Sequence, residues 1–107
     1  MKQSELDHIL NQHELWLDSN GDQGKRADLT DAHLTGANLT DAHLAGANLI
    51  GAILTSANLT RADLTGSILN SIWMNNTKVN QSQLSWLATD PNFCDWVDQL
   101  DVKKEAA

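Results

Sequence analysis

The segment 18–22, DSNGD, has oxygen-bearing side chains at every second position, a spacing found in metal-binding loops. It begins like the calcium loop of an EF-hand, in which carboxylate and amide oxygens surround the ion. Such a loop needs glycine at its sixth position and a bidentate glutamate at its twelfth, where this sequence has Gln23 and Leu29. A turn after a helix is therefore the better interpretation, and we expect no metal site.

The histidines and the single cysteine also fail to form a chemical pattern. His8 and His13 are five residues apart, whereas ligands on one face of a helix are three or four apart. His33 and His43 fall on different sides of the coil that is derived below. Cys94 has no basic neighbour that would favour its thiolate, so a buried structural thiol is expected rather than a nucleophile. No phosphate loop, nucleophile elbow or zinc pattern occurs, and we predict a protein that is not an enzyme and has no cofactor.

Length and charge narrow the class of protein further. The chain has 107 residues, enough for one domain, and a formal net charge of −7. Phosphates would be repelled by that charge, so direct binding to nucleic acid or to an anionic membrane is not expected. The sequence contains neither a signal-peptide core nor an apolar run of transmembrane length, and Cys94 has no partner for an internal disulfide. We therefore expect a cytoplasmic protein.

The strongest pattern is a repeat of five residues that runs through 27–86 in one unbroken frame of twelve units. Eight regular units (ADLTD, AHLTG, ANLTD, AHLAG, ANLIG, AILTS, ANLTR, ADLTG) are followed by four looser ones (SILNS, IWMNN, TKVNQ, SQLSW). The first position is alanine throughout the regular units. The third position is always apolar, and its residues are Leu29, Leu34, Leu39, Leu44, Leu49, Leu54, Leu59, Leu64, Leu69, Met74, Val79 and Leu84.

A period of five matches neither a lone helix nor a regular strand. On a helix it would wind the leucine stripe around the whole surface, so no single face could bury it. Within each unit, however, alanine and leucine are two residues apart and point the same way from an extended segment. The other three positions hold mostly Asp, Asn, His, Thr and Gly, which favour turns and solvent. Each unit therefore predicts a very short strand followed by a corner, with leucine inside.

These units resemble the A-(D/N)-L-x-x repeats of the pentapeptide repeat family, closely over 27–66 and loosely over 67–86. The resemblance implies an all-β solenoid, a right-handed quadrilateral β-helix with four units per coil, and hence about three coils here. A coil of twenty residues would stack outward columns such as His33–Ile53–Trp73 and His43–Asp63–Gln83, with His43 placed to hydrogen-bond Asp63. The segment 15–29 also resembles lead-in segments of bacterial members.

Residues 1–26 are predicted to form a capping helix and a loop before the repeat. The helix is expected over 4–17, with Ser4 as its N-cap and Gly21 just beyond its end. His13 should lie near the edge of its apolar stripe. That stripe consists of Leu6, Ile9, Leu10, Trp16 and Leu17.

Residues 87–107 are predicted to form a C-terminal helical cap with a frayed tail. Asp90 and Pro91 are a typical helix start, and the tail is expected to fray after Asp101. Residues from Ser82 to Ala88 form either another helical turn or a last irregular unit. The apolar stripe of the helix consists of Phe93, Trp96, Val97 and Leu100.

Four of the five aromatic residues lie in the last third of the sequence, where the repeat decays. Two interpretations stay open. They form the small core of a C-terminal cap, or they form an exposed patch that binds a second copy or another protein. These candidate interface residues are Trp73, Trp86, Phe93 and Trp96.

The function that we expect is a non-enzymatic structural or protein-interaction module whose protein partner is unknown. A homodimer through the C-terminal region is the second expectation about partners. The resemblance also implies an alternative, modulation of DNA gyrase or topoisomerase by DNA mimicry. The repeat speaks against it, because three coils are short and the four acids and two bases of 27–86 give a net charge of only −2. An enzyme is the least supported class, since no site for one is found.

Overall fold

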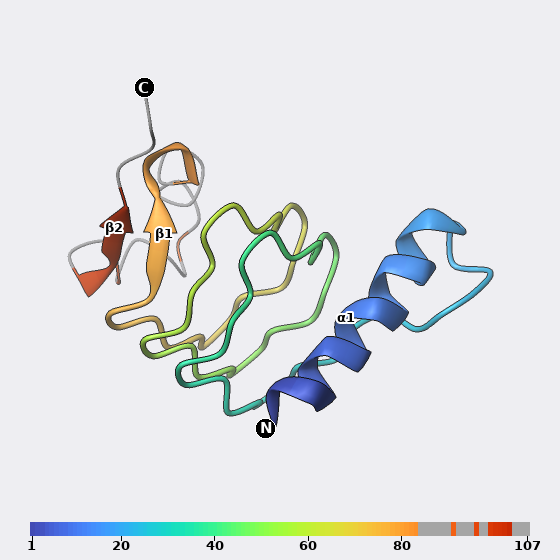
Figure 1. The fold of residues 1–107 in the computed structure, drawn as a ribbon, viewed down its shortest axis with the longest axis horizontal. Helices are drawn as coiled ribbons and strands as arrows, with labels where there is room; N and C mark the ends of the chain where they lie inside the picture. The colour runs from blue at the N-terminus through green and yellow to red at the C-terminus, as the bar shows by residue number, and fades with distance from the viewer. Residues whose placement is uncertain (84–90, 92–95, 97–98, 104–107) are drawn as a thin grey trace.

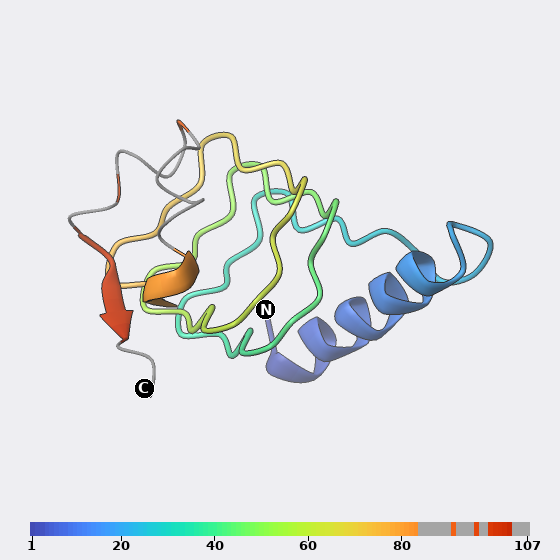
Figure 2. The same cartoon turned by 90° about the horizontal axis from the view of Figure 1, so that it is seen from above.

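The computed structural model describes residues 1–83, 91, 96 and 99–103. Its regular elements are helix α1 (Gln3–Asp18) and two short parallel strands, β1 (Lys78–Asn80) and β2 (Asp101–Lys103). Between α1 and β1 the chain winds through β-helix-like coils. Figures 1 and 2 show α1 at one end of these coils and the strand pair at the other.

The coils are held together by parallel bridges between residues that are twenty positions apart. The backbone N–H of Leu29 donates to the carbonyl of Asn48 (2.8 Å), and the N–H of Asn48 donates to the carbonyl of Ala27 (3.1 Å). The same pattern recurs on four sides of each turn. The bridged sets are Asp28–Asn48–Ile68, His33–Ile53–Trp73, Asn38–Asn58–Lys78 and His43–Asp63.

The core of the coils is made by the third residue of each unit. Eleven of these twelve residues, from Leu29 to Val79, are at most 3% exposed, and Leu84 lies outside the described residues. Alanine at the first position packs beside them, and Ala47, Ala52 and Ala57 are fully buried. Leucine therefore fills the interior, while a small residue fits the crowded inner corner.

The fifth position of each unit makes the corner, and its backbone adopts the left-handed conformation. A hydrogen bond from Ala32 N–H to the Leu29 carbonyl (3.1 Å) closes the first such turn. A type II turn requires a positive φ at its third residue, which is a conformation that favours Gly, Asn and Asp. The corner residues have φ between 56° and 73°, and they are Asp31, Gly36, Asp41, Gly46, Gly51, Ser56, Arg61, Gly66, Ser71 and Asn76.

The Asp and Asn residues at the second position stabilise the same turns. The side-chain oxygen of Asp28 accepts a hydrogen bond from the backbone N–H of Thr30 (3.1 Å), and Asn48 does the same for Ile50 (3.1 Å). An Asx side chain that bonds the backbone two residues later is a common turn device. These recurring polar residues therefore belong to the fold.

The N-cap predicted at Ser4 is wrong. Helix α1 begins one residue earlier, at Gln3, and its N-cap Lys2 makes no side-chain capping bond. The reason is tertiary, because the Gln3 side chain is used elsewhere. Its amide donates to the carbonyl of Asn38 and accepts from the N–H of Asn38, both at 3.0 Å. Gln3 thus takes the place of the preceding coil that Asn38 lacks.

His13 joins the other half of α1 to the coils. It is fully buried rather than near the edge of the stripe. Its Nδ1 accepts a hydrogen bond from the N–H of Ala27 (2.9 Å), so its Nε2 carries the proton that is donated to the carbonyl of Ala45 (2.8 Å). The ring also stacks on Trp16, with centroids 5.4 Å apart. The side chains of α1 therefore cover backbone groups at the open end of the first coil.

The loop between α1 and the coils depends on Gly24. Its φ is +70°, and an added Cβ would collide with the carbonyl oxygen of Gln12 and lie 2.7 Å from Cβ of Leu15. We expect Gly24→Ala to lower the free energy of unfolding by about 2–3 kcal/mol, measured by urea denaturation. Gly36 is the matched control, because its φ is +71° and an added Cβ would meet nothing within 4 Å. Gly36→Ala should cost about 1 kcal/mol, and equal losses would contradict the assigned packing.

The predicted C-terminal helix and frayed tail are corrected only in part. Pro91 is helical, as predicted, whereas Trp96 lies in a turn and residues 102 and 103, where the tail was expected to fray, belong to β2. Gln99 lies in a 3₁₀ turn, and β2 begins two residues later. The N–H of Asn76 donates to the carbonyl of Gln99 (2.7 Å), and the N–H of Asp101 donates to the carbonyl of Thr77 (2.9 Å). The last coil leaves backbone groups unpaired, and β2 satisfies them better than a continued helix would. Asp90, where the helix was expected to begin, lies outside the described residues.

Gln83 corrects the predicted outward column that followed His43 and Asp63. Residues 81–83 form a helical turn, which agrees with the first of the two alternatives for the segment that begins at Ser82, and Gln83 is buried rather than outward. Its amide donates to the carbonyls of Leu59 (2.7 Å) and Ala62 (3.0 Å) and accepts from the N–H of Asn80 (2.8 Å). An inward glutamine thus satisfies backbone groups at the end of the coils, as Gln3 does at the beginning.

Candidate functional site

The largest exposed aromatic side chain of the described residues is Trp73, which is 55% exposed. It occupies the second position of its unit, where side chains point outward, while its neighbours Ile72 and Met74 are buried. The indole ring packs against Trp96, with centroids 5.5 Å apart and planes tilted by 47°. Ile53 is half-buried and bridged to Trp73 in the preceding coil. We call Ile53, Trp73 and Trp96 the aromatic surface.

The structure therefore brings together two of the four predicted interface residues, Trp73 and Trp96. Trp86 and Phe93 lie outside the described residues. Trp96 is half-buried in a turn rather than on a helix. Trp96 is half-buried and Trp73 is exposed, so the pair is compatible both with a cap and with a surface for a partner.

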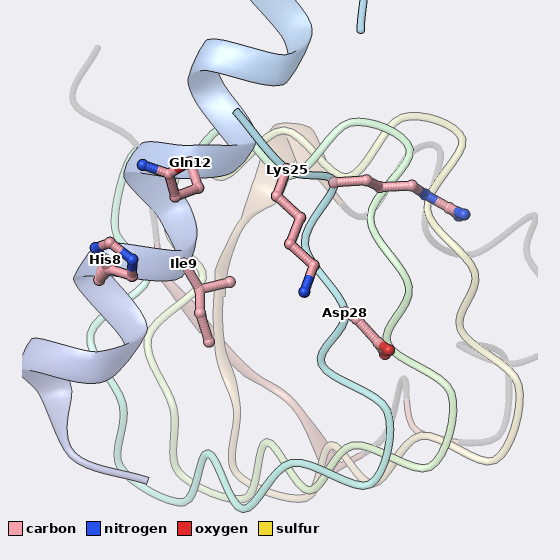
Figure 3. Close-up of a pocket in the computed structure, with 6 residues that line it drawn as sticks. His8, Ile9, Gln12, Lys25 and Asp28 are labelled. Carbon is pink, nitrogen blue, oxygen red and sulfur yellow. The ribbon is translucent and has the colours of Figure 1, made fainter. Parts of the chain in front are cut away.

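A pocket of about 240 Å³ lies at the junction of α1 with the first coil (Figure 3). The amino group of Lys25 points into the space between α1 and Asp28 (Figure 3). This junction pocket is lined by His8, Ile9, Gln12, Lys25, Arg26 and Asp28.

The charges of the junction pocket are of both signs. Asp28 accepts hydrogen bonds from the hydroxyl (2.6 Å) and the N–H (3.1 Å) of Thr30. These bonds, together with the nearby charges of Lys25 and Arg26, hold the pKa of Asp28 below its usual value. Asp28 is therefore an anion at neutral pH, next to two cations.

His43 and the EF-hand-like segment 18–22 make contacts that belong to the fold. His43 Nδ1 lies 3.1 Å from Glu14 Oε1 of α1, so the expected pairing with Asp63 is replaced by one across the junction. The hydroxyl of Ser19, within the segment 18–22, accepts a hydrogen bond from the N–H of Gln23 (2.8 Å), which makes the segment a turn. Among the residues that the structure describes, no three His, Cys, Asp or Glu side chains gather as metal ligands would.

Comparison with known families decides what the repeat is. A family model described as pentapeptide repeats matches residues 27–66 in eight copies. Residues 27–66 therefore match the pentapeptide repeat family. The resemblance drawn from the A-(D/N)-L-x-x units is thus confirmed, and the family implies a β-helix-like fold and a repeat module that is generally non-catalytic. No curated protein matches the chain.

The junction pocket was not predicted from the sequence. Lys25 and Arg26 directly precede the first unit, and only their position beside α1 makes them part of a site. The pairing of His13 with Ala27 and Ala45 was also missed, because nothing local marks a histidine that bonds distant backbone. In the described part of the chain, no helix has the length and apolar character to cross a bilayer.

Proposed function

We propose that the chain is a non-enzymatic protein-interaction module of the cytoplasm, in which about three right-handed quadrilateral coils hold the aromatic surface in a fixed position. The bridges at intervals of twenty residues and the leucine interior support this architecture. Repeat scaffolds of this kind commonly bind proteins across an extended side.

The exposure of Trp73 carries the proposal. Its neighbours in sequence are buried, so the backbone around it is held in place and the indole is presented outward. Large aromatic side chains fixed on a surface are the residues that contribute most to protein–protein affinity. Ile53 and Trp96 enlarge the apolar area around the ring, which favours a partner with an apolar contact of its own.

We further propose that the partner is a second copy of the chain. Burial of two indoles across a two-fold axis would give a self-complementary contact. The wild type is expected to have the mass of a dimer at high concentration, measured by light scattering after size exclusion. Trp73→Ala should be a folded monomer, because removal of a half-exposed ring takes away the contact without opening the core.

Leu15→Ala is the matched control, since Leu15 is 44% exposed but lies on α1. It should leave the mass unchanged. A wild type that is monomeric at every concentration would contradict the homodimer. The partner would then be a different protein, and we expect it to bind the immobilised wild type but not the immobilised Trp73→Ala variant.

A further inference from the structure

The junction pocket holds two cations, Lys25 and Arg26, that lie near the carboxylate of Asp28 but make no direct ion pair with it. Among the described residues, neither Lys25 nor Arg26 is within ion-pair distance of an acidic side chain. The Nε of Arg26 donates to the carbonyl of Gly46 (2.6 Å), which fixes the guanidinium beside the pocket. Two positive charges at one opening, of which the guanidinium of Arg26 is held in place, favour an anionic group between them.

The backbone of Asp28 forms a second feature of this pocket. In the next coil, Asn48 uses both its N–H and its carbonyl to bond the coil before it. Asp28 belongs to the first coil and has no preceding coil, and within the described residues no group bonds its N–H or its carbonyl. A donor and an acceptor therefore remain open at the edge of the pocket.

Asn38 indicates what kind of group fits such an edge. It has the same repeat position as Asp28, and the side-chain amide of Gln3 both donates to it and accepts from it. A peptide group carries the same donor and acceptor as that amide. The edge at Asp28 is thus suited to one peptide group of an extended segment, which is how strands are added to open edges.

We propose that the junction pocket binds an extended peptide segment through one peptide group at the backbone of Asp28 and one carboxylate at Lys25 and Arg26. Ile9 forms the apolar wall of this site. The carboxylate of Asp28 disfavours ligands of higher charge, such as phosphate, because it would repel a dianion more than a single carboxylate. The site is independent of the aromatic surface at the other end of the coils.

The test is an NMR titration of the ¹⁵N-labelled full chain with four probes. Acetyl-Gly-Gly has a terminal carboxylate, acetyl-Gly-Asp-Gly-amide has a side-chain carboxylate, acetyl-Gly-Gly-amide has none, and inorganic phosphate has no peptide group. We expect saturable shifts of the amides of Ile9, Lys25, Arg26 and Asp28 with at least one carboxylate peptide, and the stronger of the two identifies the source. The neutral amide and phosphate should bind about tenfold more weakly or not at all.

Two substitutions should change the affinity in opposite directions. Lys25→Met should weaken binding about tenfold, because it removes the charge and keeps the length of the side chain. Asp28→Asn should tighten binding about threefold, because it removes the repulsion. It retains the turn, since asparagine serves at Asn38 and Asn48. Lys2→Met, which changes a lysine that does not line the pocket, should have no effect.

The proposal is overturned by any of three results. The first is no shift at about 10 mM of either carboxylate peptide. The second is equal binding of the neutral amide or of phosphate. The third is unchanged affinity in Lys25→Met. None of these results bears on the mass of the protein, so they are separate from a failure of the proposed dimer.

Discussion

Leu54→Asp should abolish the cooperative thermal unfolding of the protein. Leu54 lies in the middle coil and is fully buried. Truncation of a buried leucine costs about 2–5 kcal/mol, and burial of an unpaired carboxylate adds several more. That total approaches the whole stability of an ordinary domain, which is about 5–15 kcal/mol. Far-ultraviolet circular dichroism across a temperature ramp would measure the loss.

Leu15→Asp is the control for this prediction, because it makes the same chemical change at a side chain that is 44% exposed. It should melt close to the wild type. A Leu54→Asp protein that melts cooperatively at the same temperature would show that this position does not face the interior.

His13→Phe should lower the free energy of unfolding by about 2–4 kcal/mol, because it leaves the N–H of Ala27 and the carbonyl of Ala45 buried without partners. Phenylalanine keeps the volume of the ring and its stacking on Trp16. The loss would therefore report on the two hydrogen bonds, at 2.9 and 2.8 Å, rather than on packing. Urea denaturation followed by tryptophan fluorescence would measure it.

Leu10→Ala provides the comparison, since Leu10 packs on the core from the same helix without bonding the coils. It should cost about 1 kcal/mol through lost apolar burial. A His13→Phe protein as stable as the wild type would contradict this prediction, because it would mean that water can replace both hydrogen bonds of His13.

The sequence was sufficient to predict the parts of the fold that repeat. The period of five residues placed alanine and leucine on one side of the chain, and the structure buries Leu29 through Val79. The same frame predicted a corner among the polar positions of each unit, and the structure places it at the fifth position, where Asp31 and Gly36 have left-handed φ. Because the pattern recurs in many units, single units that depart from it do not obscure the period.

The two ends of the coils could not be predicted in the same way. Gln3 and Gln83 look like ordinary surface residues in the sequence, yet each bonds backbone more than twenty residues away. Strand β2 has three residues and no repeat around it, so its pairing depends on the edge left by β1. The junction pocket depends on the position of α1, which follows from these same contacts.

The bridges between residues twenty positions apart also determine how this protein can change in length. Insertion of a single unit would rotate every later side of the coil by one position, and β2 would no longer meet β1 in register. Duplication of a whole turn, such as 47–66, would preserve each vertical stack and both terminal covers. Each added turn would lengthen the molecule by about 4.8 Å. Lengthening by duplication is therefore compatible with the fold only in steps of four units, and variants of defined length can be designed by the same rule.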